Sequence, residues 1–312
     1  MARARHDLDE AAWLGNPLCE HGCLRTLETG LLFTHDVEYF YATKCGAMER
    51  VGKLEGKSTR IGVYKCYECR KPFTVRVGTI FEDSHIPMKL WLQAIFLIAS
   101  SKKGISSNQL HRVLGVTLKS AWFLSHRIRL AMEQTGGKLG EGGGIVEADE
   151  TYFGRKPRAK KGRGGFRHKN AELALVELGG KMKSVRVKNF NDIKKVIKDN
   201  IDPAARFMTD EHKKFRKIGK QFASHETVNR FQKEYARGDV TTNTVEGVFS
   251  IFKRGMEGIY QHCHASHLHR YLAEFDFRYN NRVALEINDH QRAENILGGV
   301  TGKRLTYQTV AR

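Results

Sequence analysis

The sequence predicts an α/β protein with about two domains, and three observations support this. Its 312 residues are enough for about two domains of ordinary size. From residue 145 onward, stretches with strand character alternate with stretches of helical spacing, which is typical of a domain built on a mixed sheet. Five of the six cysteines and a long helical pattern precede that region, so the first part of the chain is expected to be organised separately.

Residues 1–85 have the composition of a small domain stabilised by a bound metal. The region is rich in glycine, lysine and aromatic residues, and it contains the spacing Cys66-x-x-Cys69. No secretory signal is visible before these cysteines. They are therefore expected to be thiols or metal ligands in a reducing, cytoplasmic environment rather than disulfides.

Residues 86–134 show the spacing of helices. Apolar residues recur at three- and four-residue intervals, first from Leu90 to Ile98 and again from Leu110 to Ile128. A turn around Gly115 separates two helices, the second of which begins near Thr117. This pattern fits a helix-turn-helix motif whose second helix contacts DNA, and an ordinary helical hairpin fits it as well. The candidate DNA contacts on that helix are Lys119, Arg127 and Arg129.

A glycine-rich run at residues 135–144 is expected to be a flexible linker, because six of its ten residues are glycine. The domain that follows spans residues 145–290. Its expected strands are 145–151, 173–178, 183–187, 205–209 and 224–228, and its expected helices are 192–200 and 213–222, with further helices after Thr244 and His267. Gly179-Gly180 favours a tight hairpin between the second and third strands. Residues 291–312 are expected to form a C-terminal tail.

The formal net charge of +19 indicates a polyanionic partner. Nucleic acid is the expected partner, because each neutralised phosphate also releases a counterion. No apolar stretch approaches the roughly 20 residues that a membrane helix needs, so a membrane partner is not expected. A strongly basic loop between the first two strands is expected to contact the DNA backbone through residues that include Arg155, Lys156, Lys160, Lys161 and Arg163.

Three carboxylates stand out by their positions in the predicted α/β domain. Asp149 lies in the first strand, Asp210 ends a later strand, and Glu246 begins a late helix. Ligands of open α/β sheets gather at strand ends, and oxygen ligands of this kind bind Mg²⁺ or Mn²⁺. Such ions would activate an oxygen nucleophile for attack on a phosphodiester.

Other interpretations of the same acids are open. Strand periodicity alone does not choose among Glu147, Asp149 and Glu150, since the first two share a face and the third points the other way. Asp210 and Glu246 could instead belong to helix caps, the latter with Asn243 as the N-cap residue. On the late helix, however, Glu246, Ser250 and Lys253 share one face, which suits a metal ligand beside a phosphate contact.

Several segments, taken together and in this order, resemble the bacterial insertion-sequence transposases of the zinc-ribbon type, an ISXO-like group related to the Merlin transposons. They include YKCYECRKPFTVRVGTIFEDSHIP, VEADETYFGRK, FMTDEH, HETVN, RGDVTTNTVEGVFSIFKRG and HLHRYLAEFDFRYNNR. The resemblance covers about residues 45–282. It implies a ribonuclease H-like catalytic domain in which Asp149, Asp210 and Glu246 are metal ligands and Lys253 is a companion residue. Some relatives use an asparagine as the third member, which makes Asn243 the competing assignment.

The N-terminal part departs from the family pattern. The first cysteine of the family's ribbon is replaced by Ala42, which leaves Cys45, Cys66 and Cys69 one ligand short of a four-thiolate zinc site. Cys23 is the first choice for the fourth ligand, and Cys19 and His35 are the alternatives.

The resemblance implies a DNA transposase that cleaves insertion-sequence ends, joins the 3′-hydroxyl to target DNA, and acts as a homo-oligomer on its terminal inverted repeats. Two other functions fit the same residues: a non-catalytic repressor derived from a transposase, and a stand-alone metal-dependent nuclease.

Overall fold

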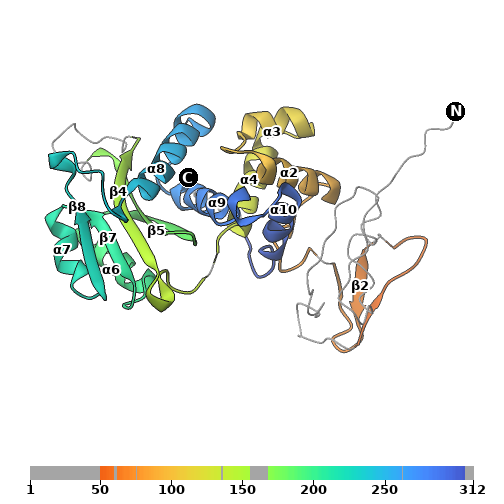
Figure 1. The fold of residues 1–312 in the computed structure, drawn as a ribbon. Helices are drawn as coiled ribbons and strands as arrows, with labels where there is room; N and C mark the ends of the chain where they lie inside the picture. Colours follow the sequence, from red (N-terminus) through yellow and green to blue (C-terminus); the bar gives the residue numbers. More distant parts are fainter. Residues whose placement is uncertain are drawn as a thin grey trace. The chain divides into compact units, whose positions relative to one another are not determined.

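A computed structural model describes residues 50–59, 62–74, 76–134, 136–154, 168–261 and 263–305, shown in Figure 1. The chain divides into two compact units. Of the described residues, the helical unit contains those up to Ser100, Ser107–Met132, and those from Ile287 onward. The sheet unit contains Ser101–Ser106 and Glu133–Glu286.

Within the helical unit, a small antiparallel sheet precedes the helices. Its strands, in the order β1-β2-β3, are β1 (Val51–Lys53), β2 (Val63–Cys66) and β3 (Pro72–Thr74). Tyr64, Cys66 and Phe73 form its core, with Cys69 packed against it. The turn after β2 therefore places both cysteines of the Cys-x-x-Cys pair beside one small core. Cys23 and Cys45 lie outside the described residues, so a zinc site here stays a prediction.

The helices predicted for residues 86–134 are α2 (Met88–Ser100), α3 (Ser107–Leu114) and α4 (Leu118–Ala131). Gly115 makes the turn between α3 and α4 with a φ of +66°, a conformation that glycine adopts without strain. Thr117 caps α4, because its hydroxyl accepts the backbone N–H of Ser120 at 3.1 Å. The two helices and their turn are thus as predicted, while their use in binding DNA remains to be tested.

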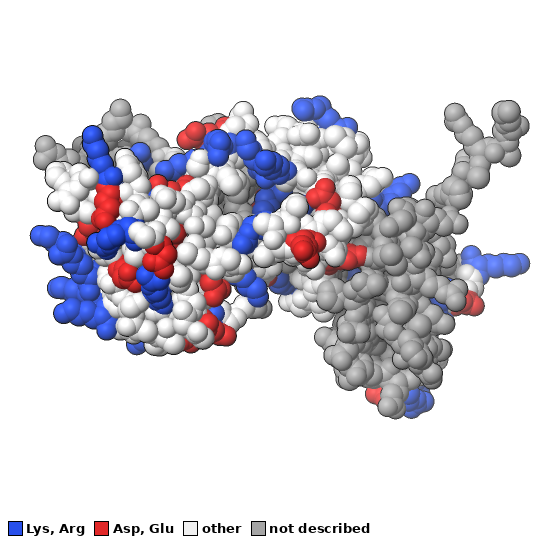
Figure 2. Space-filling model, in the orientation of Figure 1, with Lys and Arg blue, Asp and Glu red and all other residues white. Residues whose placement is uncertain are grey.

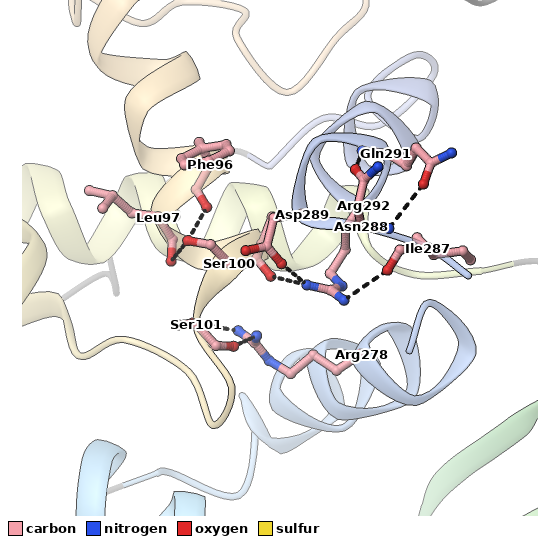
Figure 3. A network of polar contacts seen from close by, with 11 residues as sticks. Phe96, Leu97, Ser100, Ser101, Arg278, Ile287, Asn288, Asp289, Gln291 and Arg292 are labelled. Atoms are coloured by element: carbon pink, nitrogen blue, oxygen red, sulfur yellow. Dashed lines mark hydrogen bonds and ion pairs between the residues drawn. The ribbon is translucent and has the colours of Figure 1, made fainter. Parts of the chain in front are cut away.

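The C-terminal segment is not a tail. It contains α10 (Asp289–Gly298), which packs against α2 and α4. Arg292 of α10 donates to the carbonyl of Ala99 at 3.1 Å and also contacts Asp289 (Figure 3). Each end of this helix has polar partners, since Asn288 and Gln291 form a capping box and the carbonyl of Val300 accepts the N–H of Ile80. The expected boundary at residue 290 is therefore misplaced.

Two of the three expected DNA contacts on α4 are wrong. Arg127 is 3% exposed, and its guanidinium donates to the carbonyls of Ile80, Glu82 and Leu305 at 2.5 to 3.2 Å. Arg129 is 1% exposed and donates to the hydroxyl of Ser125. Both side chains hold the helical unit together from inside. Lys119 is exposed at the start of α4 and stays a candidate DNA contact.

The sheet unit is an α/β domain with a mixed five-stranded sheet in the order β6-β5-β4-β7-β8. The central strand β4 (Ile145–Phe153) pairs antiparallel with β5 and parallel with β7. Strands β5 (Asn170–Glu177) and β6 (Met182–Val187) form the predicted hairpin, and β7 (Arg206–Asp210) and β8 (Ser224–Val228) run parallel to each other. The predicted order of strands and helices is confirmed.

Helices cover both faces of this sheet. On one face, α6 (Phe190–Asn200) and α7 (Lys213–Gly219) pack with Val146 and Ala148 of β4 and with Leu173 and Leu175 of β5. On the other face, α8 (Asn243–Gly255) packs with Ala174 and Val176. The last helix of this unit, α9 (Leu268–Asn280), packs with the end of α8 and with β6. Alternate residues of β4 and β5 thus serve two separate cores.

Arg278 of α9 reaches the Ser101–Ser106 segment of the same unit, donating to the hydroxyl of Ser101 at 3.1 Å (Figure 3). The remaining elements are short: η1 (Glu141–Gly143), η2 (Arg230–Gln232), β9 (Ala236–Arg237), β10 (Val240–Thr241), the π-helix η3 (Met256–Tyr260) and η4 (Val283–Leu285). Among the described residues, no helix has the length and apolar character needed to cross a membrane.

The glycine-rich run is ordered over its described residues 136–144 and is not a flexible linker there. Leu139 is buried, and its backbone exchanges hydrogen bonds with Asn200 and Asp202. Gly140 has a φ of +76°, and a Cβ at this position would lie 2.5 Å from the Cβ of Ala205. Glycine is therefore required by close packing against the sheet unit rather than by mobility.

Candidate active site

Strand β4 separates the functions of its three acids. Glu147 is fully buried on the α8 side, where its Oε2 accepts the backbone N–H of Val245 at 2.9 Å. Glu150 points to the other side and forms an ion pair with Lys214 of α7. Glu147 thus anchors the start of α8 and Glu150 joins β4 to α7. Asp149 is the remaining acid, and it lines an open cleft.

Asp149 and Asp210 lie beside each other because β4 and β7 are parallel. The register pairs Glu147 with Met208, so two residues further along Asp149 is level with Asp210. Burial, reinforced by the negative charge of Asp210, raises the pKa of Asp149 to about 7, although Lys214 opposes the rise. Burial also raises the pKa of Asp210, against a hydrogen bond that its Oδ1 accepts from the N–H of His212 at 3.1 Å. Two carboxyl groups are thereby held together in a partly dry environment.

Glu246 reaches the same region from the first turn of α8. Its negative charge contributes to the raised pKa of Asp149, and its carboxylate forms an ion pair with Arg230. Arg230 also donates to the hydroxyl of Thr242 at 2.6 Å and, more distantly, to the Oδ1 of Asn243 at 3.5 Å. Arg230 therefore joins both candidates for the third acidic position to the loop that follows β8.

The proposed capping pair of Asn243 and Glu246 is wrong. Thr242 is the N-cap residue of α8, and Asn243 is already helical. The backbone N–H of Glu246 donates to the carbonyl of Thr242 at 3.2 Å, while the side chains of Asn243 and Glu246 both face Arg230. Glu246 is therefore not occupied by a capping role.

The cleft beside Asp149 has a volume of about 560 Å³. Its lining combines acidic residues of β4 with one face of α8: Asp149, Glu150, Thr151, Glu246, Phe249, Ser250, Lys253 and Arg254. The shared helix face expected for Glu246, Ser250 and Lys253 is thus present and opens onto Asp149. A cluster of carboxylates beside Lys253 and Arg254 can hold a cation and an anionic phosphate next to each other.

The acidic residues suit a hard divalent cation in their chemistry, although they do not form a closed cage. Among the described residues, no three His, Cys, Asp or Glu side chains are close enough to ligate one metal as they stand. Burial raises the pKa values of Asp149 and Asp210, and Glu246 faces Arg230. Carboxylate oxygens in such a setting are the donors that Mg²⁺ and Mn²⁺ prefer.

The sequence patterns missed two basic residues at this site, Arg230 and Lys214. Arg230 lies in a short turn without periodic spacing, and nothing local indicates that it reaches α8. Figure 2 shows Lys and Arg side chains gathered over the part of this unit occupied by α7, beside a patch of acidic side chains. The exposed basic residues of α7 and its C-terminal end are Lys213, Arg216, Lys217 and Lys220. The basic-loop residues Arg155, Lys156, Lys160, Lys161 and Arg163 lie outside the described residues.

A mixed-sheet α/β domain with paired acids on adjacent parallel strands and a lysine on the facing helix has the residue types that phosphoryl-transfer chemistry needs. Comparison with known proteins identifies the domain more closely. Residues 142–280 match the family described as the ISXO2-like transposase domain. This match confirms the resemblance of the domain to insertion-sequence transposases. An uncharacterized protein in transposable element ISH50 of Halobacterium salinarum is 25% identical over 209 residues, which cover 61% of this chain and 69% of that protein.

Proposed function

We propose that the protein is a transposase that cuts DNA at the ends of its insertion sequence and joins the freed 3′-hydroxyl to target DNA, using a ribonuclease H-like domain. The observation that carries this proposal is the pair Asp149 and Asp210, level on parallel strands, with a raised pKa at both carboxyl groups. The transposase family of residues 142–280 supports it.

In this proposal Asp149, Asp210 and Glu246 hold Mg²⁺ or Mn²⁺, with Asn243 as the competing third residue. Bound divalent cations would supply Lewis acidity to the attacking and leaving oxygens of an in-line phosphoryl transfer. Glu246 joins the set by leaving Arg230, whose guanidinium then becomes available to a DNA phosphate. Lys253 contacts DNA near the scissile phosphate, consistent with its place in the cleft lining.

DNA is held by further parts of the chain. Lys119 and the basic loop contact the DNA backbone, and the region of Cys66 and Cys69, completed by Cys45 and Cys23, binds Zn²⁺ and the terminal repeats. The protein acts in the cytoplasm at the bacterial nucleoid and forms a homo-oligomer on its two DNA ends.

The test uses full-length protein, labelled element-end DNA, a target plasmid and Mg²⁺, scored separately for cleavage and for joined product. Asp149→Asn, Asp210→Asn and Glu246→Gln are expected to lower cleavage by at least about a hundredfold while leaving DNA affinity within about threefold. The matched control is Asp199→Asn, an exposed acid on α6, which should cut like the parent.

Three outcomes would contradict parts of the proposal. Cleavage without joining would indicate a nuclease, and DNA binding without either reaction would indicate a repressor. Full activity of Glu246→Gln together with loss of activity in Asn243→Ala would transfer the third role to Asn243.

A further inference from the structure

A second, smaller cavity lies next to the acidic cleft, between the end of β4, the start of β5 and the C-terminal part of α8. Its volume is about 230 Å³, and its lining residues are Phe153, Gly154, Asn170, Lys253, Met256, Glu257, Gln261 and Cys263. Lys253 lines both cavities. A molecule that fills the small cavity is therefore a direct neighbour of whatever occupies the acidic cleft.

Asn170 is the polar residue in this cavity that needs explanation. Asn170 is 4% exposed, and its Oδ1 has no hydrogen-bond partner among the residues that the structure describes. A buried polar group without a partner destabilises the folded state, because its hydrogen bonds to water are lost and no hydrogen bond within the protein replaces them. A ligand that donates to this oxygen would remove that penalty, so the cavity has a polar anchor ready for a partner.

The remaining walls suit a flat, partly apolar group. The ring of Phe153 is held edge-on against Phe252, with 5.0 Å between the ring centroids. Gly154 has a φ of +59° and lies beside the amide of Asn170, since a Cβ there would be in ordinary contact with Nδ2 at 3.8 Å. Met256 and Glu257 of the π-helix η3 also line the cavity, and π-helices are rare elements that are frequent at functional sites.

The backbone conformation of Gln261, which lines the cavity, is a second and independent observation on this site. Gln261 follows η3 with a φ of +55° and a ψ of −49°, a conformation that is strained for a non-glycine residue. Its N–H donates to the carbonyl of Met256 at 2.8 Å, which closes the π-turn. Strain of this kind persists where the surrounding structure enforces it, often at ligand-binding sites.

We propose that this cavity binds one unstacked nucleobase of the DNA strand whose phosphate lies in the acidic cleft, with adenine as the preferred base. An asparagine amide pairs with adenine through two hydrogen bonds, donating to N7 and accepting from the N6 amino group. The unpartnered Oδ1 of Asn170 supplies the acceptor, and Phe153 supplies an apolar surface for the base. The proposal rests on the proposed transposase function and adds a sequence-reading contact to it.

The experiment scans 2-aminopurine through the positions that neighbour each adenine around the cleaved bond of element-end duplexes, with full-length protein in Ca²⁺ to keep the DNA intact. The probe stands beside the adenine because 2-aminopurine itself lacks the N6 amino group. At one position, fluorescence should rise on binding because the neighbouring adenine leaves the stack. Replacing that adenine with 7-deazaadenine, which lacks N7, should weaken binding by roughly tenfold, because one of the two hydrogen bonds to the amide can no longer form.

The variant Asn170→Ser should be insensitive to that replacement, because it already lacks the amide. Gln261→Ala, which changes an exposed lining residue, should reduce the fluorescence rise without altering the melting temperature. Asn200→Ser is the matched control, since Asn200 lies on α6 and its amide donates to the carbonyl of Val196 at 2.7 Å. It should behave like the parent.

The proposal is overturned if no position becomes fluorescent on DNA that the protein binds, or if 7-deazaadenine weakens the parent and Asn170→Ser equally. Cleavage of the same duplexes in Mg²⁺ separates the two claims. An Asn170-dependent signal without cleavage or joining would retain the base site and reject the transposase function, whereas cleavage without that signal would reject only the base site.

Discussion

Replacing Glu147 tests whether strand β4 positions α8, the helix that contains Glu246. Glu147 lies two residues before Asp149 on the same face of β4, and its carboxylate holds the N–H of Val245, the residue before Glu246. Glu147→Leu would leave that buried N–H without an acceptor. We therefore expect the first turn of α8 to loosen and Glu246 to lose its position, although neither Asp149 nor Glu246 is altered.

The size of the effect follows from the burial of this contact. An unsatisfied buried N–H costs about 1–3 kcal/mol. At about 2–4 °C per kcal/mol for a chain of this size, a loss of about 2 kcal/mol lowers the melting temperature of Glu147→Leu by about 4–8 °C. Glu147→Gln keeps an oxygen that accepts the N–H, and its amide carries no charge to bury. Burial already raises the pKa of the Glu147 carboxyl group, so the melting temperature of Glu147→Gln should stay within about 4 °C of the parent.

The assay combines thermal unfolding with DNA cleavage measured well below the melting temperature. Glu147→Leu should lose cleavage even where it is fully folded, and Glu147→Gln should retain most of it. Glu141→Gln changes an exposed carboxylate in η1 and serves as the control. Equal melting temperatures and equal cleavage for the Leu and Gln variants would refute a positioning role for Glu147.

Three further predictions concern other parts of the chain. Burial raises the pKa of Asp276 from an ordinary 3.8 to about 7, so the folded state binds an extra proton between those values and its stability should fall as the pH rises from about 4 to 7. The variant Asp276→Asn can still accept the N–H of Ser184, and it should flatten this dependence on pH. In urea titrations at about pH 8, Asp276→Asn should therefore be more stable than the parent. Arg127→Leu should lower the melting temperature by several degrees, because it leaves buried carbonyl groups without a donor. Lys119→Ala should instead weaken DNA binding at an unchanged melting temperature. Weaker DNA binding by Arg127→Leu at an unchanged melting temperature would restore Arg127 as a DNA contact. Neutralising Lys160, Lys161 and Arg163 together should weaken binding to all DNA sequences alike. The slope of log affinity against log salt concentration should become shallower by about 0.9 for each phosphate contact that is lost. An unchanged slope would mean that the loop does not contact DNA.

The architecture of the sheet unit was predictable because its signals are local. Each strand and helix there has its own periodicity, and Gly179-Gly180 specifies a hairpin by conformation alone. The acidic pair was also predictable, since Asp149 lies within β4 and Asp210 ends β7, and these two strands are parallel neighbours. Strand periodicity could not choose Asp149 over Glu147 and Glu150, and the family resemblance made that choice. The structure adds a physical reason, because Val245 and Lys214 engage Glu147 and Glu150.

The errors arose where distant parts of the chain decide the outcome. Arg127 and Arg129 have the composition of a DNA-binding helix, yet backbone carbonyls from residues 80, 82 and 305 surround the first of them. Gly140 belongs to a run that is typical of linkers, but the close approach of Ala205 explains why glycine is needed there. The smaller cavity could not be predicted from the sequence either, because Phe153, Asn170 and Gln261 have no common spacing.

The helical unit is assembled from segments that precede and follow most of the sheet unit in the sequence, and this has a consequence for synthesis on the ribosome. Arg127 finds one of its acceptors at Leu305, and Arg292 of α10 finds one at Ala99. Domains generally fold as units as the chain emerges. The sheet unit can therefore fold as soon as residue 286 has left the ribosome, while α2 and α4 wait for α10. A nascent chain would accordingly possess its acidic cleft before its helical unit is complete. Ribosome-stalled chains in which residue 286 is followed by an unstructured linker long enough to carry it out of the exit tunnel should protect the sheet unit, but not α2 and α4, from proteolysis.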